Sequence, residues 1–144
     1  MLECLILGDN IGIGLSMVRP ACVQMTASGT NSFNWYKDFN KRPGYYATMY
    51  QYVVISIGIY DHDGIDTEQN IMDIRSKITS EKVIWLMPSP VKRKKQYDFI
   101  MKYVKECGDI PIDVYPYTGI DDIHPPTLND YKKLSNEITW RLKQ

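Results

Sequence analysis

The sequence lacks the features that mark membrane-spanning and exported proteins. No apolar stretch approaches the ~20 residues that a membrane-spanning helix needs, and no basic segment precedes the first apolar run, as it would in a signal peptide. These absences predict synthesis in the cytoplasm, without fixing a final location. The chain also lacks a surplus of charge, since 17 basic residues balance 17 acidic ones. Composition therefore predicts no bulk attraction to nucleic acid or to an anionic membrane.

Cysteine and histidine are scarce as well. The three cysteines, Cys4, Cys22 and Cys107, are odd in number and lie at or near apolar segments. This favours buried thiols over a disulfide framework. Neither the cysteines nor the two histidines have the spacing of a metal site, so we expect no metal and no cofactor.

What remains is the composition of an ordinary soluble domain. The chain has 144 residues, of which 44% are hydrophobic and 24% charged. This length supports one good core, so residues 1–144 are predicted to form a single domain. Eleven tyrosines and three tryptophans can either fill that core or line a binding surface.

Strand and helix patterns alternate along the chain. Short apolar or β-branched runs predict five strands, at residues 5–7, 21–26, 52–57, 83–86 and 110–115. Helices are predicted from residue 11, over 33–39, over 67–78, from the basic cluster at 92–95 to 106, and after Thr127. The basic cluster is assigned to a solvated first turn, because nothing aromatic or glycine-rich is interleaved with it. The alternation predicts a three-layer α/β/α sandwich around a mostly parallel sheet.

In such a sheet, ligands bind at the carboxyl ends of the strands. Three loops compete for this role, at residues 8–10, 58–63 and 121–124, and Gly29 follows the second strand. We predict that all of them converge at one edge of the sheet. Taken alone, Asp9 and Asn10 favour an Asx turn that caps a helix at Ile11 over a ligand site.

Asp121 and His124 stand three residues apart in the last of these loops. At this spacing an aspartate can hydrogen-bond the imidazole and hold one tautomer, while the other ring nitrogen faces a substrate. The alternative is that Asp121 caps a turn and His124 is an exposed loop residue before a proline.

Four segments in order resemble the motif blocks of the SGNH (GDSL-type) hydrolase family. The segments are LILGDNIGIGL, TASGTNS, SIGIYD and DDIHPPTLNDYKKLSNEI. They stand where that family has Gly-Asp-Ser, a loop glycine, Gly-x-Asn-Asp and Asp-x-x-His-Pro. The resemblance implies the flavodoxin-like SGNH fold. It also places Asp121 and His124 in a catalytic dyad, and Gly29, Asp9 and Asp61 in the same site.

The sequence departs from the family pattern at two of the four residues, Ser, Gly, Asn and His, that give the family its name. Asn10 stands where the family has its nucleophilic serine, and a carboxamide cannot be activated as a hydroxyl can. Tyr60 stands where the family has the asparagine that donates to the oxyanion. The dyad and the backbone amides near Asn10 and Gly29 remain.

Two functional classes stay open. The first is an ester or O-acyl hydrolase of weakened activity, acting on acylated carbohydrate or another small ester through water activated by His124, or through Ser28 or Ser32. The second is a pseudoenzyme that uses the remnant pocket to bind a glycan or a protein. An engineered replacement at Asn10 would be a third explanation, although alanine is the more usual substitute for a nucleophilic serine. The short chain leaves little room for a lid, so an open, shallow site is expected.

Overall fold

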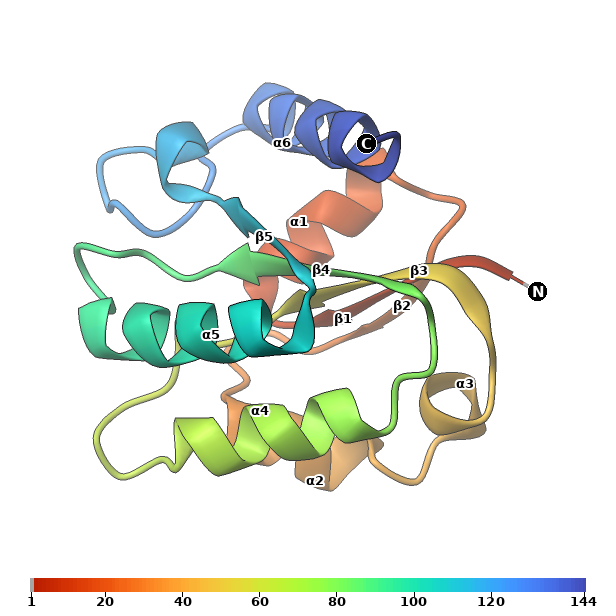
Figure 1. Cartoon of the computed structure of the whole chain (residues 1–144). Coiled ribbons are helices and arrows are strands. Elements are labelled where there is room, and N and C mark those ends of the chain that lie inside the picture. Colours follow the sequence, from red (N-terminus) through yellow and green to blue (C-terminus); the bar gives the residue numbers. More distant parts are fainter. Residues whose placement is uncertain (1) are drawn as a thin grey trace.

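The computed structural model describes residues 2–144, which form a five-stranded sheet between two layers of helices (Figure 1). The strands are β1 (Leu2–Gly8), β2 (Val23–Thr26), β3 (Tyr50–Ser56), β4 (Lys82–Met87) and β5 (Ile110–Asp113). Their order is β2-β1-β3-β4-β5, and every neighbouring pair is parallel. The predicted three-layer sandwich with a parallel sheet is confirmed.

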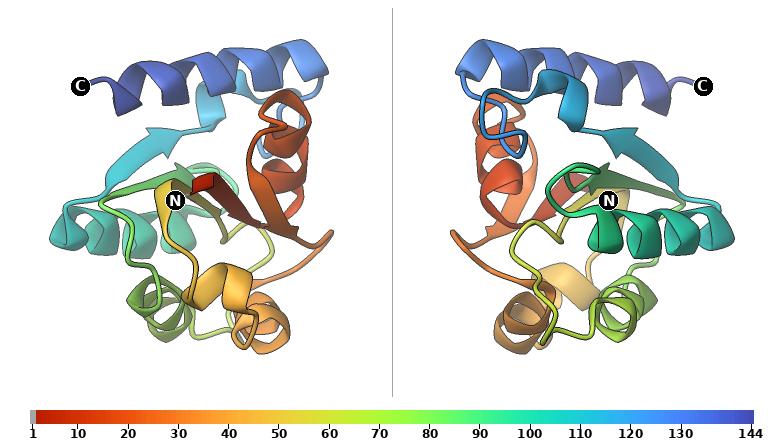
Figure 2. Two further views of the ribbon diagram at one scale, coloured as in Figure 1. Left: turned by 90° about the vertical axis from the view of Figure 1, so that its right-hand side faces the viewer. Right: turned by 90° about the vertical axis from the view of Figure 1, so that its left-hand side faces the viewer.

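The helices divide between the two faces of the sheet, as both views in Figure 2 show. One face is covered by α1 (Asn10–Val18) and α6 (Leu128–Leu142). The other face is covered by α2 (Ser32–Phe39), the short α3 (Pro43–Tyr46), α4 (Thr67–Ser76) and α5 (Lys94–Cys107). A 3-10 helix, η1 (Tyr115–Tyr117), follows β5. Within residues 2–144, no helix is both long and apolar enough to cross a bilayer.

Each face of the sheet has its own hydrophobic core, because successive side chains of a strand point to opposite faces. In β3, Val53 and Ile55 pack toward α2, α4 and α5, whereas Val54 packs toward α1 and α6. Burial on both faces explains why β3 reads as a continuous apolar run rather than an alternating one.

Two segments differ from the prediction. The short α3 was not among the predicted helices; Pro43 begins it, since proline fits the first turn of a helix, where its missing N–H is not needed. The last strand was expected to reach residue 115, but β5 ends at Asp113 and the chain then turns into η1. Pro111 lies in this edge strand, where a missing N–H is tolerated.

The expectation of buried thiols is wrong. Cys4 and Cys22 form a disulfide with a Cα–Cα distance of 4.6 Å. The register explains the pairing, because Leu5 of β1 lies opposite Val23 of β2 and the two cysteines precede these residues. Cys107, at the end of α5, is a free thiol and is exposed.

Candidate active site

Asp9 follows β1 and caps α1 from a fully buried position. Its Oδ1 accepts hydrogen bonds from the backbone N–H of Ile11 at 3.1 Å and from the hydroxyl of Ser56 at 2.9 Å. Its Oδ2 is buried without a hydrogen-bond partner among residues 2–144. Burial raises the pKa of Asp9 to about 7, although the bonds from Ser56 and Ile11 oppose the shift. The predicted cap is therefore present, with α1 starting one residue earlier, at Asn10.

Asn10 joins the loop after β1 to the loop after β2. Its Oδ1 accepts the backbone N–H of Gly29 at 2.7 Å, and its Nδ2 donates to the Oγ of Ser28 at 3.0 Å. Gly29 has a φ of 71°, a conformation that side chains disfavour. Both polar atoms of the Asn10 carboxamide are therefore engaged by the neighbouring loop.

Asp61 follows β3 and ties two helices to the sheet. Its Oδ1 accepts the backbone N–H of Ser32 at 2.8 Å, and its Oδ2 accepts the hydroxyls of Ser32 and Thr67, both at 2.7 Å. The amide of Asn70 also donates to the Ser32 Oγ at 3.1 Å. Ser32 is fully buried, so its hydroxyl serves this network and is closed to a substrate.

Tyr60 precedes Asp61 in the loop after β3, and its side chain is half-buried. Burial raises the pKa of its hydroxyl, the charge of Asp9 adds to the rise, and the charge of Arg93 opposes it. Tyr60 therefore lies within electrostatic reach of both the buried Asp9 and Arg93, the residue that precedes α5.

The loop before α6 holds the predicted pair of Asp121 and His124 in contact. The Asp121 Oδ2 lies 2.8 Å from the His124 Nδ1, and its Oδ1 accepts the backbone N–H groups of Ile123 and His124 at 2.9 and 3.0 Å. Partial burial acts to raise the pKa of Asp121, but these hydrogen bonds outweigh it and lower the pKa to about 2. Asp121 is thus ionised at neutral pH and accepts a proton-bearing Nδ1, which leaves the His124 Nε2 as the basic nitrogen.

Tyr131 of α6 links this loop to the end of β1. Its ring packs against Gly14 of α1, where an added Cβ would lie 2.1 Å from the tyrosine Cζ. Burial raises the pKa of Tyr131 to about 12, with further contributions from the charges of Asp9, Asp121 and Tyr60. One side chain is therefore within reach of three of the predicted site residues. This agrees with the parallel sheet, which brings all strand-following loops to one edge.

Three residues that shape this edge were not singled out from the sequence. Ser56 supports Asp9, Thr67 supports Asp61, and Tyr131 lies between the two loops. Ser56 is the penultimate residue of a predicted strand and Thr67 begins a predicted helix, positions where hydroxyl residues are common and carry no signal. Across residues 2–144, no three His, Cys, Asp or Glu side chains gather as a metal site would require.

The fold is that of the SGNH (GDSL-type) hydrolases. A proposed acylhydrolase from Bacteroides fragilis matches with a TM-score of 0.72 at 17% identity, covering 99% of this chain and 86% of that one. A proposed lipolytic protein of the G-D-S-L family from Desulfitobacterium hafniense matches with a TM-score of 0.69 at 16% identity and 99% coverage of both chains. A psychrotrophic esterase from Pseudoalteromonas, in a form inhibited by monoethylphosphonate, matches with a TM-score of 0.65 at 14% identity and 100% coverage of both.

No protein-family model and no curated protein matches the sequence. The structural matches, at 14–17% identity, establish the shared fold.

Proposed function

We propose that this protein is an SGNH hydrolase-like protein, related to ester and O-acyl carbohydrate hydrolases, in which acyl transfer is attenuated or lost. One observation carries the proposal. The Asn10 Oδ1 accepts the Gly29 N–H at 2.7 Å, at the position where the resemblance expects a serine hydroxyl and a free backbone amide.

The first consequence concerns the nucleophile. An acyl-enzyme needs a group that attacks the carbonyl carbon and leaves again, and a carboxamide is a poor nucleophile that a histidine base cannot activate. The basic Nε2 of His124 therefore has no hydroxyl at position 10 from which to take a proton.

The second consequence concerns the oxyanion. By resemblance, the Gly29 amide would donate to the oxygen of a tetrahedral intermediate, but the Asn10 carbonyl already accepts it. Tyr60 replaces a second donor, and loss of one such donor costs roughly 3 kcal/mol in comparable sites. A substrate would have to displace the Asn10 side chain before this amide could contribute.

A residual hydrolytic route stays open. The His124 Nε2 makes no hydrogen bond to the described residues 2–144, and with Asp121 it can act as a base toward water. Of the two alternative serines, Ser32 is buried and engaged. Ser28 is exposed and accepts from Asn10, so it is the better candidate for a substitute nucleophile.

The second candidate function is a non-catalytic module that binds a glycan or a protein in the remnant pocket. The observation that favours it is the complete pairing of the Asn10 carboxamide. Both of its polar atoms hold the loop containing Ser28 and Gly29 in place, which preorganises the edge of the sheet for binding.

Replacing Asn10 tests the proposal. With an activated acetyl ester, the natural chain is expected to give no burst of acyl-enzyme, and Asn10→Ser is expected to give one that disappears on His124→Ala. Asn10→Ala is the matched control, because it frees the Gly29 amide without supplying a hydroxyl, and it should stay inactive. Tyr60→Asn should raise the activity of Asn10→Ser by up to about 10²-fold through the restored donor.

Two outcomes would redirect the assignment. Strong hydrolysis by the natural chain that survives His124→Ala would place catalysis elsewhere. Equal inactivity of Asn10→Ser and the double variant with Tyr60→Asn would favour the binding module.

A further inference from the structure

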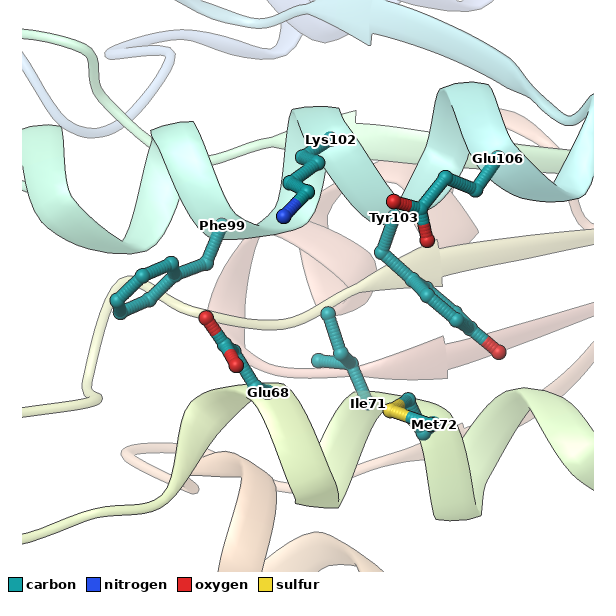
Figure 3. Close-up of a pocket in the computed structure, with 7 residues that line it drawn as sticks. All are labelled: Glu68, Ile71, Met72, Phe99, Lys102, Tyr103 and Glu106. Atoms are coloured by element: carbon teal, nitrogen blue, oxygen red, sulfur yellow. The ribbon is translucent and has the colours of Figure 1, made fainter.

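A hollow of about 450 Å³ opens beside the candidate active site. Its lining includes Tyr60, Asp61, His62, Asp63, Lys92 and Arg93. Two of the predicted site residues, Tyr60 and Asp61, line the hollow directly, and Arg93 is tied to the same loop through the carbonyl of Ile59. By contrast, the pocket between α4 and α5 in Figure 3 measures about 90 Å³ and is lined by residues of those two helices, such as Ile71 and Phe99, with none from the site loops.

The cationic groups of the hollow are free to bind an anion, whereas one of its carboxylates is held in hydrogen bonds and the other faces water. Asp61 is only 3% exposed, and both of its oxygens accept hydrogen bonds from Ser32 or Thr67. The Asp63 side chain is 94% exposed and lies 3.8 Å from the ammonium of Lys95. Among the ion pairs within residues 2–144, none joins Asp61 or Asp63 to Lys92 or Arg93.

Arg93 is held in a fixed orientation by two backbone carbonyls. Its Nε donates to the carbonyl of Ile59 at 2.6 Å, and its Nη1 donates to the carbonyl of Lys92 at 2.9 Å. Its Nη2 has no hydrogen-bond partner within the described part of the chain, residues 2–144. A guanidinium already fixed in this way loses little conformational freedom when it binds an anion. The first turn of α5 contains no acidic side chain to compete for it.

We propose that this hollow binds an anionic oxygen group of the ligand, with Arg93 and Lys92 as its partners. The ligand of the candidate active site is then an acidic carbohydrate, bearing a carboxylate or a phosphate, rather than a neutral one. The carbohydrate part of this assignment rests on the proposed function. The anion-binding part rests on the hollow itself, and it revises the expectation that the basic cluster at 92–95 is only a solvated turn.

Titration of the isotope-labelled natural chain by NMR tests the assignment with three sugars of similar size at equal ionic strength. Glucuronate supplies a carboxylate, glucose 6-phosphate supplies a phosphate, and glucose supplies neither. We expect at least one of the anionic sugars to shift the backbone amide signals of residues 58–63 and 92–96, and glucose to leave them unchanged. The anion that binds more tightly identifies which of the two groups the site prefers.

Three variants with the same change of charge sharpen the test. Arg93→Gln should weaken binding of the anionic sugar about tenfold, as expected for the loss of a charge-assisted hydrogen bond. Lys92→Gln, whose side chain makes no hydrogen bond in residues 2–144, should weaken it about threefold and serves if Arg93→Gln does not fold. Lys94→Gln is the control, because Lys94 pairs with Asp98 and does not line the hollow, and it should bind like the natural chain.

The proposal is overturned if neither anionic sugar shifts these signals, if glucose shifts them equally, or if Lys94→Gln weakens binding as much as Lys92→Gln. The readout involves no turnover. Failure of Asn10→Ser to hydrolyse esters would therefore leave the anion site standing, and failure of the sugars to bind would leave the proposed loss of acyl transfer standing.

Discussion

Asp9 carries its carboxyl group where water does not reach. Oδ1 has two donors and Oδ2 has no partner within residues 2–144, an arrangement that suits a neutral carboxyl better than a carboxylate. Its position was predictable from the sequence, because a polar residue after an apolar strand and a glycine caps the following helix. Its burial was not predictable, since it depends on Ser56 and Tyr131, which the fold brings in from β3 and α6.

The first prediction concerns the pH dependence of stability. An unfolded aspartate titrates near its ordinary value of 3.8, whereas the pKa of Asp9 is about 7 in the folded chain. Between these values only the folded state holds the proton. The stability contributed by Asp9 is therefore complete below about pH 4 and falls as pH rises to 7, by up to about 4 kcal/mol.

Urea unfolding at a series of pH values from 4.5 to 8 measures how steeply the free energy of unfolding falls with pH. Asp9→Asn keeps an oxygen for Ile11 and Ser56 but cannot titrate, so its stability should fall less over the range than that of the natural chain. Asp63→Asn changes an exposed carboxylate and should retain the natural slope. Identical slopes for the natural chain and Asp9→Asn would contradict the buried, protonated carboxyl.

Most of the helices and strands follow from local sequence pattern. The β-branched run of β3 predicts a strand because both faces of a central parallel strand are buried. The spacing of Ile71 and Ile74 in α4 predicts a helix because only one face of a surface helix is buried. The short α3 and the early end of β5 do not follow in this way. A four-residue helix has too few residues for a periodic pattern, and β5 ends because the chain turns into η1.

The turn from β1 into α1 depends on Gly8, which gives the second prediction. Gly8 has a φ of 129°, and an added Cβ would lie 1.8 Å from the carbonyl oxygen of Ser56. Gly8→Ala should therefore lower the free energy of unfolding by more than about 3 kcal/mol or prevent folding, since the backbone at Ser56 would have to move. Gly108 is the control, with a φ of 72° and no atom within 4 Å of an added Cβ, and Gly108→Ala should cost only about 1 kcal/mol. Similar unfolding midpoints for the two variants would contradict this.

The position of the candidate site depends on the parallel direction of the five strands. Asp121 and Asn10 are far apart in sequence, and they were expected at one edge because each follows a strand of the same direction. The disulfide escaped prediction because the number of cysteines says nothing of strand register. Only the pairing of Leu5 with Val23 places Cys4 beside Cys22.

The third prediction is that this disulfide stabilises the chain by closing a loop of 18 residues. Closing such a loop removes conformational entropy from the unfolded chain and so raises the free energy of unfolding by about 3 kcal/mol. A reductant should lower the urea midpoint of the natural chain and leave that of a Cys4→Ala/Cys22→Ala variant unchanged. Cys107→Ala should respond to the reductant like the natural chain. A natural chain whose midpoint ignores the reductant would contradict a stabilising disulfide.

The Asn10 Oδ1 accepts the Gly29 N–H, and we propose that Asn10 stands in place of the nucleophile. Mass spectrometry of the intact chain after brief exposure to a reactive alkylphosphonate ester tests this, because such a reagent reacts much faster with an activated hydroxyl than with other side chains. The natural chain and Asn10→Ala should remain unlabelled, and Asn10→Ser should gain one label, mapped to position 10 and lost with His124→Ala. A His124-dependent label on the natural chain at Ser28 would identify the substitute nucleophile. Such a label at any other residue, or an Asn10→Ser variant labelled anywhere but position 10, would contradict the proposal.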